Sequence, residues 1–310
     1  MTTRLGFVGL GVMGASMVRR LLEHGWPVTV TDVRPEAAEA LAGLGATAVG
    51  TAAEVGAAAE VVLVSLPSPA ALQQVALGAD GLVHGERVRA VVDLSTTGPV
   101  VAREVAARLG EAAIEVLDCP VSGGAKGAVD GTLTLMAAGR RELFDELDPY
   151  LAAIGTKRFY VGSEPGQGQL AKVANNILGA TSIAIVAEVL SLGVKGGLEA
   201  ETLLEVINAS TGRNGVTEGM YPRIVLPRTF DAGFRLALEV KDVGLCLEEA
   251  NHQHVPMVVG GAVQQLWNIA GATAEEGADF TTIAKLVEGW AGVTLASRQA
   301  AGLAPSRPAG

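Results

Sequence analysis

The ten residues LGFVGLGVMG, at positions 5 to 14, decide the fold of this chain. They open with a short apolar run, Leu5 to Val8, which predicts a buried strand, and continue with three glycines. Gly9 permits a tight turn, Gly11 lets the backbone approach a pyrophosphate, and Gly14 allows the next helix to pack closely on the strand. The free amides of a helix that begins here would face an anion. We therefore predict a dinucleotide-binding strand, turn and helix.

A carboxylate stands where the ribose of such a cofactor would be held. Asp32 follows the second predicted strand, 18 residues after Gly14, where it can accept hydrogen bonds from the adenosine ribose hydroxyls. Arg34 could instead contact a 2′-phosphate, but Asp32 would repel that group. We predict NAD as the cofactor, with NADP as the alternative. Asp32 could also simply cap the helix that follows Pro35.

Short β-branched runs alternate with helix-length segments in the first half of the chain. An order of strand, helix and strand implies parallel pairing with right-handed crossovers. We predict an α/β fold, with a doubly wound parallel sheet of the Rossmann type over residues 1–164, an all-α domain over residues 165–298 and a loose tail over residues 299–310. The expected strands are Leu5 to Val8, Val28 to Thr31, Val61 to Ser65, Ala90 to Leu94 and Ile114 to Leu117, with Thr132 to Ala138 and Arg158 to Val161 extending the sheet around a helix over 140–154.

From Pro165 onward the segments become long and helical. Pro165 stands where a helix could start, and Lys172 is the only charged residue from there to Ala187, so this helix belongs in an interior. Its apolar surface exceeds what one small domain covers, so we expect a homodimer or homotetramer. Further helices are expected at 199–209, 239–254, 257–272 and 279–290.

The composition argues against several classes of protein. The 310 residues are 49% hydrophobic and 18% charged, which favours a folded chain of about two domains. The net charge is -10 and no run of Lys and Arg occurs, so nucleic acid and anionic membranes are not expected partners. Cys119 and Cys246 match no metal-ligand spacing, so we expect no metal site, no disulfide framework and a cytoplasmic location. The most apolar long segment, Ile177 to Ala187, has 11 residues, too few to span a bilayer.

A second motif, GQLAKVANN at 168–176, predicts a reactive face on the apolar helix. Lys172, Asn175 and Asn176 fall at i, i+3 and i+4, so they share one face. An ammonium group on an apolar helix is costly to desolvate, which favours its neutral form and suits it to proton transfer. We expect Lys172 to be catalytic. The alternative is a surface lysine at a frayed helix start.

Two loops after predicted strands complete the candidate site. In DCPVSGG, at 118–124, Ser122, Gly123 and Gly124 can receive a carboxylate at the carboxyl end of a strand, or form only a loop. In DLSTTGP, at 93–99, Thr96 could touch the nicotinamide ribose or only cap the helix that follows.

The segment at 210–223 is expected to line the substrate pocket, although the sequence does not indicate its conformation. Arg213 and Asn214 could bind the part of the substrate that is remote from the reacting alcohol. They could equally lie at a solvated junction of helix and loop.

Together these motifs resemble the β-hydroxyacid dehydrogenase family, which includes 3-hydroxyisobutyrate dehydrogenase and tartronate semialdehyde reductase and is related to 6-phosphogluconate dehydrogenase. The resemblance covers nearly the whole chain through GLGVMGASM, LP at 66–67, STTGP at 95–99, DCPVSGG, GQLAKVANN and KDVGL at 241–245. It implies an NAD(P)-dependent oxidoreductase that acts on a small 3-hydroxy acid such as 3-hydroxyisobutyrate, or on glycerate and tartronate semialdehyde.

The resemblance also implies roles for individual residues. Lys172 would be the general acid/base, while hydride passes between the carbinol carbon and nicotinamide C4. Ser122, Gly123, Gly124 and Asn176 would hold the substrate. The cofactor would be bound by Gly9, Leu10, Gly11, Val12, Met13, Gly14, Asp32, Arg34, Leu66, Pro67, Thr96 and Lys241. Two alternatives stay open, an imine reductase-like enzyme and a non-catalytic NAD(P)-binding sensor, and relatives of both kinds lack the lysine that matches Lys172.

Overall fold

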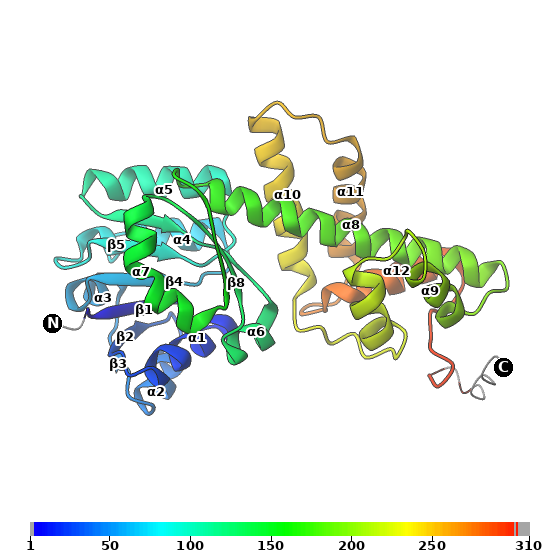
Figure 1. Cartoon of the computed structure of the whole chain (residues 1–310), viewed down its shortest axis with the longest axis horizontal. Coiled ribbons are helices and arrows are strands. Elements are labelled where there is room, and N and C mark those ends of the chain that lie inside the picture. Colours follow the sequence, from blue (N-terminus) through cyan, green and yellow to red (C-terminus); the bar gives the residue numbers. More distant parts are fainter. Residues whose placement is uncertain (1–2, 301, 303–310) are drawn as a thin grey trace. The chain divides into compact units, whose positions relative to one another are not determined.

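The computed structural model describes residues 3–300 and 302. The chain divides into two compact units, Met1–Ala174 and Asn175–Gly310, and the division falls inside the long helix α8 (Gln167–Lys195). Strands lie in the first unit and helices dominate the second (Figure 1). Of the tail predicted over residues 299–310, residues 301 and 303–310 lie outside the described part.

The described part of the first unit is built on one sheet of nine strands, in which the strand order is β3-β2-β1-β4-β5-β6-β8-β7 and β9 pairs with β8. Every pair from β3 to β6 is parallel, which confirms the predicted doubly wound arrangement. The five predicted strands are correct to within one residue at each end. They are β1 (Leu5–Val8), β2 (Val28–Thr31), β4 (Val61–Val64), β5 (Ala90–Asp93) and β6 (Glu115–Asp118).

The sheet continues beyond β6 with a change of direction. β8 (Thr134–Ala138) runs antiparallel to β6 and to β7 (Val121–Ser122), and β9 (Lys157–Gly162) pairs with β8 in parallel. Together with α7 (Arg141–Ile154) these strands confirm the predicted extension of the sheet. β7 and β3 (Thr47–Ala48) were not predicted, because two residues are too few to show an alternating pattern.

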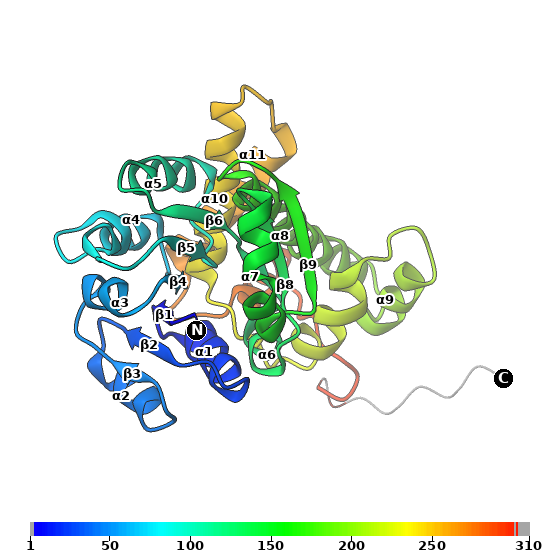
Figure 2. The ribbon, with the colours of Figure 1, turned by 60° about the vertical axis from the view of Figure 1, so that its left-hand side comes forward.

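Helices cover both faces of this sheet (Figure 2). One face carries α1 (Val12–Glu23), α2 (Pro35–Ala42) and α7, and the other carries α3 (Ala52–Ala58), α4 (Pro69–Leu77), the short η1 (Leu82–His84) and α5 (Pro99–Glu111). α6 (Gly124–Asp130) lies beside α1. Because both faces are covered, all four residues of β1, β4 and β5 are buried, which explains why these strands are continuous apolar runs.

The second unit confirms the predicted helices to within three residues at their ends, with the helix predicted at 279–290 divided into a short 3-10 helix and an α-helix. Its described helices after α8 are α9 (Ala200–Asn208), α10 (Leu236–His252), α11 (Val258–Thr273), η3 (Phe280–Thr282) and α12 (Ile283–Ala291). The region whose conformation the sequence did not indicate forms η2 (Val216–Val225), a stretch of π-helix. The i→i+5 hydrogen bonds of such a segment produce no side-chain repeat that a helix of ordinary period would show.

α8 begins at Gln167, so the predicted start at Pro165 was two residues early. The physical reason is Gly166, whose φ of +94° is not helical. By length and composition alone α8 could cross a membrane, and 44% of its most apolar 18-residue stretch is buried inside the fold. Two fully buried side chains bond to its backbone, since Tyr221 donates to the Ile183 carbonyl at 2.8 Å and Trp267 donates to the Ala180 carbonyl at 3.3 Å. In the second unit α8 is therefore a core helix.

Candidate active site

The glycine loop holds β1 tightly against the start of α1. Gly9 has a φ of +92°, and a Cβ there would lie 2.3 Å from the carbonyl oxygen of Ser65. A Cβ on Gly14 would lie 1.9 Å from the carbonyl oxygen of Gly9. At Gly11, in contrast, a Cβ would meet no atom within 4 Å. The fold therefore requires glycine at positions 9 and 14, whereas the bare backbone at Gly11 leaves room for a ligand.

The amino terminus of α1 opens onto the same place. The helix begins directly after Gly11, and no side-chain cap satisfies its first amides. Unsatisfied amides and the helix dipole both favour an anion at this position. The loop and helix thus fit the pyrophosphate of a dinucleotide, and the structure brings together the predicted residues Gly9, Leu10, Gly11, Val12, Met13 and Gly14.

Asp32 lies beside this loop and is held there by hydrogen bonds. One carboxylate oxygen accepts from the Leu10 amide at 2.6 Å, and the other accepts from the amide and the Nε of Arg34 at 2.9 and 3.1 Å. Burial tends to raise the pKa of Asp32, but these hydrogen bonds outweigh it and hold the pKa below its ordinary value. The residue that caps α2 is Arg34, so the alternative that Asp32 caps this helix is wrong.

The loops after β4 and β5 lie next to each other. The Leu66 amide donates to the Ser95 hydroxyl at 2.9 Å, and the Leu66 side chain also lies against Gly9. Thr96 is half-buried, and α5 is capped by Gly98 without a side-chain bond, so the alternative that Thr96 caps this helix is wrong. The loop of Leu66 and Pro67 therefore borders the glycine loop, and the loop of Thr96 borders that of Leu66.

The turn after β7 consists of two glycines in conformations with positive φ. Gly123 has a φ of +131° and Gly124 a φ of +64°, and both are exposed. Ser122 ends β7, and α6 begins at Gly124 without a side-chain cap. Because Gly123 and Gly124 are exposed and carry no side chain, a carboxylate can approach the backbone of this turn.

Lys172 lies in the second turn of α8 and is buried, so the alternative of a surface lysine at a frayed helix start is wrong. Asn176 follows one helical turn later. In the second unit the Asn176 Nδ2 donates to the buried carboxylate of Asp242 at 2.6 Å, and the Lys241 ammonium forms an ion pair with the same carboxylate at 2.8 Å. Asp242 thus holds two predicted site residues together, although the sequence analysis assigned it no role.

A buried polar network lies under the first turn of α8. Asp93 and Asp118 end β5 and β6 and stand opposite each other in the register of the two strands. Burial raises the pKa of Asp118 to about 7, and the carboxylate of Asp93 adds to the rise. The Asp118 carboxylate accepts from the amides of Gly166 and Gln169 at 2.8 and 3.0 Å. The sequence analysis missed these residues, although an acid at the end of two adjacent apolar strands is a visible signal.

Arg213 and Asn214 have local partners. The side-chain oxygen of Asn214 accepts from the amides of Val216 and Thr217 at 2.9 and 3.2 Å, which forms a local turn before η2. Arg213 is exposed and lies 3.6 Å from a carboxylate oxygen of Glu218. These contacts fit the alternative of a solvated junction of helix and loop.

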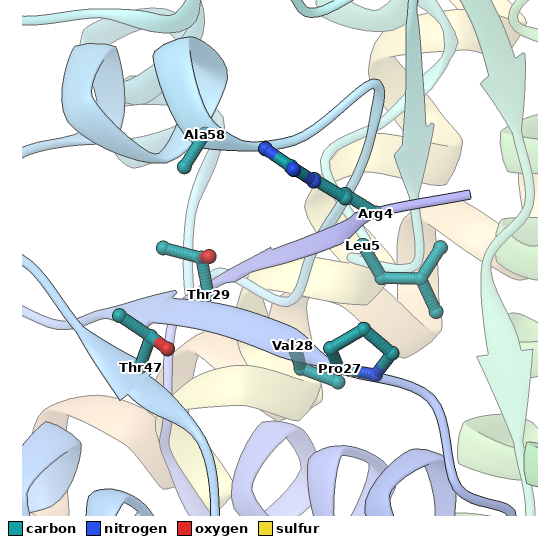
Figure 3. A pocket seen from close by; sticks show the side chains of 7 residues that line it. All are labelled: Arg4, Leu5, Pro27, Val28, Thr29, Thr47 and Ala58. Carbon is teal, nitrogen blue, oxygen red and sulfur yellow. The ribbon is translucent and has the colours of Figure 1, made fainter. Parts of the chain in front are cut away.

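A hollow of about 240 Å³ lies at the opposite end of the strands (Figure 3). Leu5 and Val28 begin β1 and β2 there, whereas Gly9 and Asp32 follow the other ends of the same strands. Ligands of open α/β sheets bind outside the carboxyl ends of the strands, so this hollow is separate from the cofactor site. It is lined by Arg4, Leu5, Pro27, Val28, Thr29, Thr47 and Ala58.

Two family models match the chain. The NAD binding domain of 6-phosphogluconate dehydrogenase matches residues 4–162, and the NAD-binding domain of NADP-dependent 3-hydroxyisobutyrate dehydrogenase matches residues 166–287. The chain belongs to the β-hydroxyacid dehydrogenase family. The resemblance seen in the sequence is therefore confirmed, and with it an NAD(P)-dependent oxidoreductase with a Rossmann domain and a helical second domain.

Individual relatives match this chain along almost its whole length. A 3-hydroxyisobutyrate dehydrogenase of Pseudomonas aeruginosa is 37% identical, and the match covers 93% of this chain and 99% of the relative. A 2-(hydroxymethyl)glutarate dehydrogenase of Eubacterium barkeri is 33% identical, with 96% and 98% covered. A solved structure described as Mycobacterium tuberculosis 3-hydroxyisobutyrate dehydrogenase with L-serine has a TM-score of 0.85 and 31% identity, with 93% and 99% covered.

The different surroundings of Gly11 and Gly14 lead to a prediction. Gly11→Ala should leave the melting temperature unchanged, because the new methyl group meets no protein atom, but should weaken NAD binding by roughly tenfold or more, because it occupies the approach to the pyrophosphate. Fluorescence titration with NADH and thermal unfolding measure the two effects.

Gly14→Ala is the matched control, and it should lower the melting temperature because its methyl group would clash with the Gly9 backbone. Unchanged NADH affinity in a folded Gly11→Ala variant would contradict the assignment of this loop to the pyrophosphate.

Proposed function

We propose that this enzyme transfers hydride between NAD(P) and the terminal alcohol of a small 3-hydroxy acid, with Lys172 as the general acid/base. The observation that carries the proposal is the buried lysine in the second turn of α8, in the same unit as the glycine loop. A lysine amine that is held away from bulk water at a fixed place on a helix can exchange a proton with a bound substrate.

In the proposed mechanism the residues of the chain bind the acid and move one proton. Ser122 and the amides of Gly123 and Gly124 receive the substrate carboxylate. Lys172 takes the proton of the substrate hydroxyl during oxidation and returns it to the carbonyl oxygen during reduction. A cofactor held by the glycine loop and Asp32 would supply or accept the hydride of the carbinol carbon through its nicotinamide ring. Asn176 is assigned to the substrate and Lys241 to the cofactor, and their shared partner Asp242 supports a joint role.

The names of the relatives suggest the chemical class of the substrate. 3-Hydroxyisobutyrate, 2-(hydroxymethyl)glutarate and serine all carry a hydroxymethyl group on the carbon next to a carboxylate. They differ only in the remaining substituent of that carbon. We propose this shared unit as the part of the substrate that the Ser122–Gly124 turn and Lys172 recognise. Glycerate, the reduced form of tartronate semialdehyde, also contains the unit.

Replacement of the lysine tests the proposed mechanism. Lys172→Ala should lower kcat by ~10²-fold or more, because no other group is assigned to exchange the hydroxyl proton. Nicotinamide absorbance should be followed with 3-hydroxyisobutyrate, glycerate, threonate, serine and dihydroxypropanesulfonate, each with NAD and with NADP.

Lys195→Ala is the matched control, since Lys195 ends the same helix and donates to the Ala291 carbonyl at 2.8 Å. It should keep normal turnover. A Lys172→Ala variant with near-normal turnover would overturn the assignment, and silence of the wild-type enzyme with every acid would favour the imine reductase or sensor alternatives.

We propose NAD as the preferred cofactor, because Asp32 is ionised and fixed beside the loop where a 2′-phosphate would approach. Asp32→Ala should change the ratio of kcat/KM with NAD to kcat/KM with NADP by roughly tenfold or more in favour of NADP, since the repulsion is removed while Arg34 stays.

Glu36→Ala controls for a general loss of negative charge near the loop, because Glu36 lies in the first turn of α2. It should leave the ratio nearly unchanged. An unchanged ratio in Asp32→Ala as well would contradict the role of Asp32 in cofactor choice.

We also propose a homodimer or homotetramer that associates through α8. Leu178, Ile185 and Leu192 are 70%, 48% and 74% exposed and are spaced seven residues apart, so they form one apolar stripe along the helix. Such a stripe is unfavourable in water and fits a second helix.

Two charges placed on this stripe should dissociate the assembly. The double variant Leu178→Glu/Leu192→Glu should run as a monomer in size-exclusion chromatography with light scattering, because a buried carboxylate without a partner opposes association. Val33→Glu, at a residue that is 97% exposed, is the control and should leave the assembly intact. A wild-type protein that is monomeric at micromolar concentration would contradict the proposed homodimer or homotetramer.

The proposed location is the cytoplasm. Both cysteines, Cys119 and Cys246, are buried and free, which fits a reducing compartment. Nucleic acid and membranes are not proposed as partners.

A further inference from the structure

The side chain of Gln169 is fully buried and uses all of its hydrogen-bonding capacity. Its oxygen accepts from the backbone amides of Thr97 and Gly98 at 2.9 and 3.1 Å. Its nitrogen donates to the Ser95 carbonyl at 3.0 Å and to the Asp118 carboxylate at 2.9 Å. A carboxamide offers two donor hydrogens and an oxygen with two lone pairs, so these four bonds fix its orientation completely.

The backbone around Gln169 is held as firmly as its side chain. The Asp118 carboxylate accepts from the amides of Gly166 and Gln169, which ties the first turn of α8 to the end of β6. Gly168 touches the sheet directly, because a Cβ there would lie 2.5 Å from the Met136 carbonyl oxygen and 2.7 Å from that of Asp118. These contacts therefore hold the first turn of α8 in place against the strands.

The loop at 95–98, to which Gln169 is hydrogen-bonded, is also held by Asp93. The Asp93 carboxylate accepts from the Ser95 amide at 2.9 Å and from the Thr97 hydroxyl at 3.2 Å. Residues 95–98 are thus held between Asp93, at the end of β5, and the carboxamide of Gln169. This loop contains Thr96, which the family motif assigns to the cofactor.

Lys172 follows Gln169 by three residues, so the two side chains share one face of α8. We infer that Gln169 is a positioning residue that sets Lys172 against the cofactor loop 95–98. The inference rests on the proposed function, because it concerns the geometry in which Lys172 exchanges its proton. An apolar side chain of equal size would fill the same space, but it would not tie the helix to the loop in one direction.

Gln169→Met removes the four side-chain hydrogen bonds and keeps nearly the same volume and a good helix former. We expect kcat to fall roughly 10- to 100-fold, because a small displacement of an acid/base group is costly, while KM for NAD changes by less than about threefold. A merely space-filling role for Gln169 would leave kcat unchanged.

Gln169→Glu supplies a pH-dependent rescue. A carboxylate at position 169 would face Asp118 on β6 and Asp93 on β5, with Lys172 one turn along α8, and it would lose the donor to the Ser95 carbonyl. When protonated, the same side chain again has one donor and one acceptor. The kcat of this variant should be divided by that of the wild type at the same pH. This ratio should rise as the pH falls from 8.5 to 6, roughly the range in which a buried Glu titrates. It should rise more steeply than the ratio for Gln169→Met, in which Asp118 titrates but residue 169 does not.

Tyr221→Phe is the control for lost stability, since it removes one buried hydrogen bond in the second unit, to the Ile183 carbonyl. Its kcat should match the wild type even where its melting temperature falls. A folded Gln169→Met variant with wild-type kcat, or a Gln169→Glu ratio that does not depend on pH, would overturn the inference and leave the proposed function intact.

Hydrogen exchange of the protein without ligands tests the hydrogen bonds between Gln169 and the 95–98 loop by a readout that does not depend on enzyme activity. In Gln169→Met the amides of residues 95–98 and 166–172 should exchange faster than in the wild type, and in Tyr221→Phe they should not. If the wild-type enzyme turns over no hydroxy acid, the proposed function fails, and the positioning of a catalytic lysine fails with it. If the wild-type enzyme turns over a hydroxy acid but hydrogen exchange in Gln169→Met is unchanged, only the positioning role is contradicted.

Discussion

The candidate site depends on the hydrogen bonds that the buried carboxylate of Asp118 accepts. This carboxylate stands at the end of β6, is removed from water and accepts hydrogen bonds from two amides at the start of α8 and from the side chain of Gln169. Burying an acid costs free energy unless its oxygens are hydrogen-bonded. The hydrogen bonds to Asp118 come from the segment that leads into Lys172, so they hold that segment against the sheet. The helix that carries Lys172 therefore starts from a fixed point on the sheet.

Most of the first unit could be predicted from the sequence, because its strands are buried on both faces and so are continuous apolar runs separated by helices of ordinary length. The pattern does not reveal where β3 and β7 lie, since each has only two residues. It also does not reveal the π-helical segment η2, because the i→i+5 pattern of that segment gives no side-chain repeat of ordinary helical period.

The site was predictable where a residue type has a direct chemical reason. The glycines of the loop, Asp32 and the buried Lys172 are of this kind, and their contacts with cofactor and substrate stay predictions. Gln169 and Asp242 were not predictable, since their roles consist of bonds to other protein groups that only the folded chain brings near. Asp118 could have been singled out by its place at the end of an apolar strand, but its partners could not. A glutamine or an aspartate inside a quoted motif gives no sign of whether it faces a ligand or another part of the protein.

Asp242 illustrates what such a hidden partner implies. One buried carboxylate serves both the amide of Asn176 and the ammonium of Lys241, so neither contact can be strengthened or lost without changing the electrostatic field that the other experiences. The amide of Asn176 and the ammonium of Lys241 have this carboxylate as a shared partner. If a ligand drew Lys241 away from Asp242, the contact between Asp242 and Asn176 would change as well, and reciprocity requires the same coupling free energy for a ligand that acts first on Asn176. Two side chains 65 residues apart in the sequence are in this way energetically one unit.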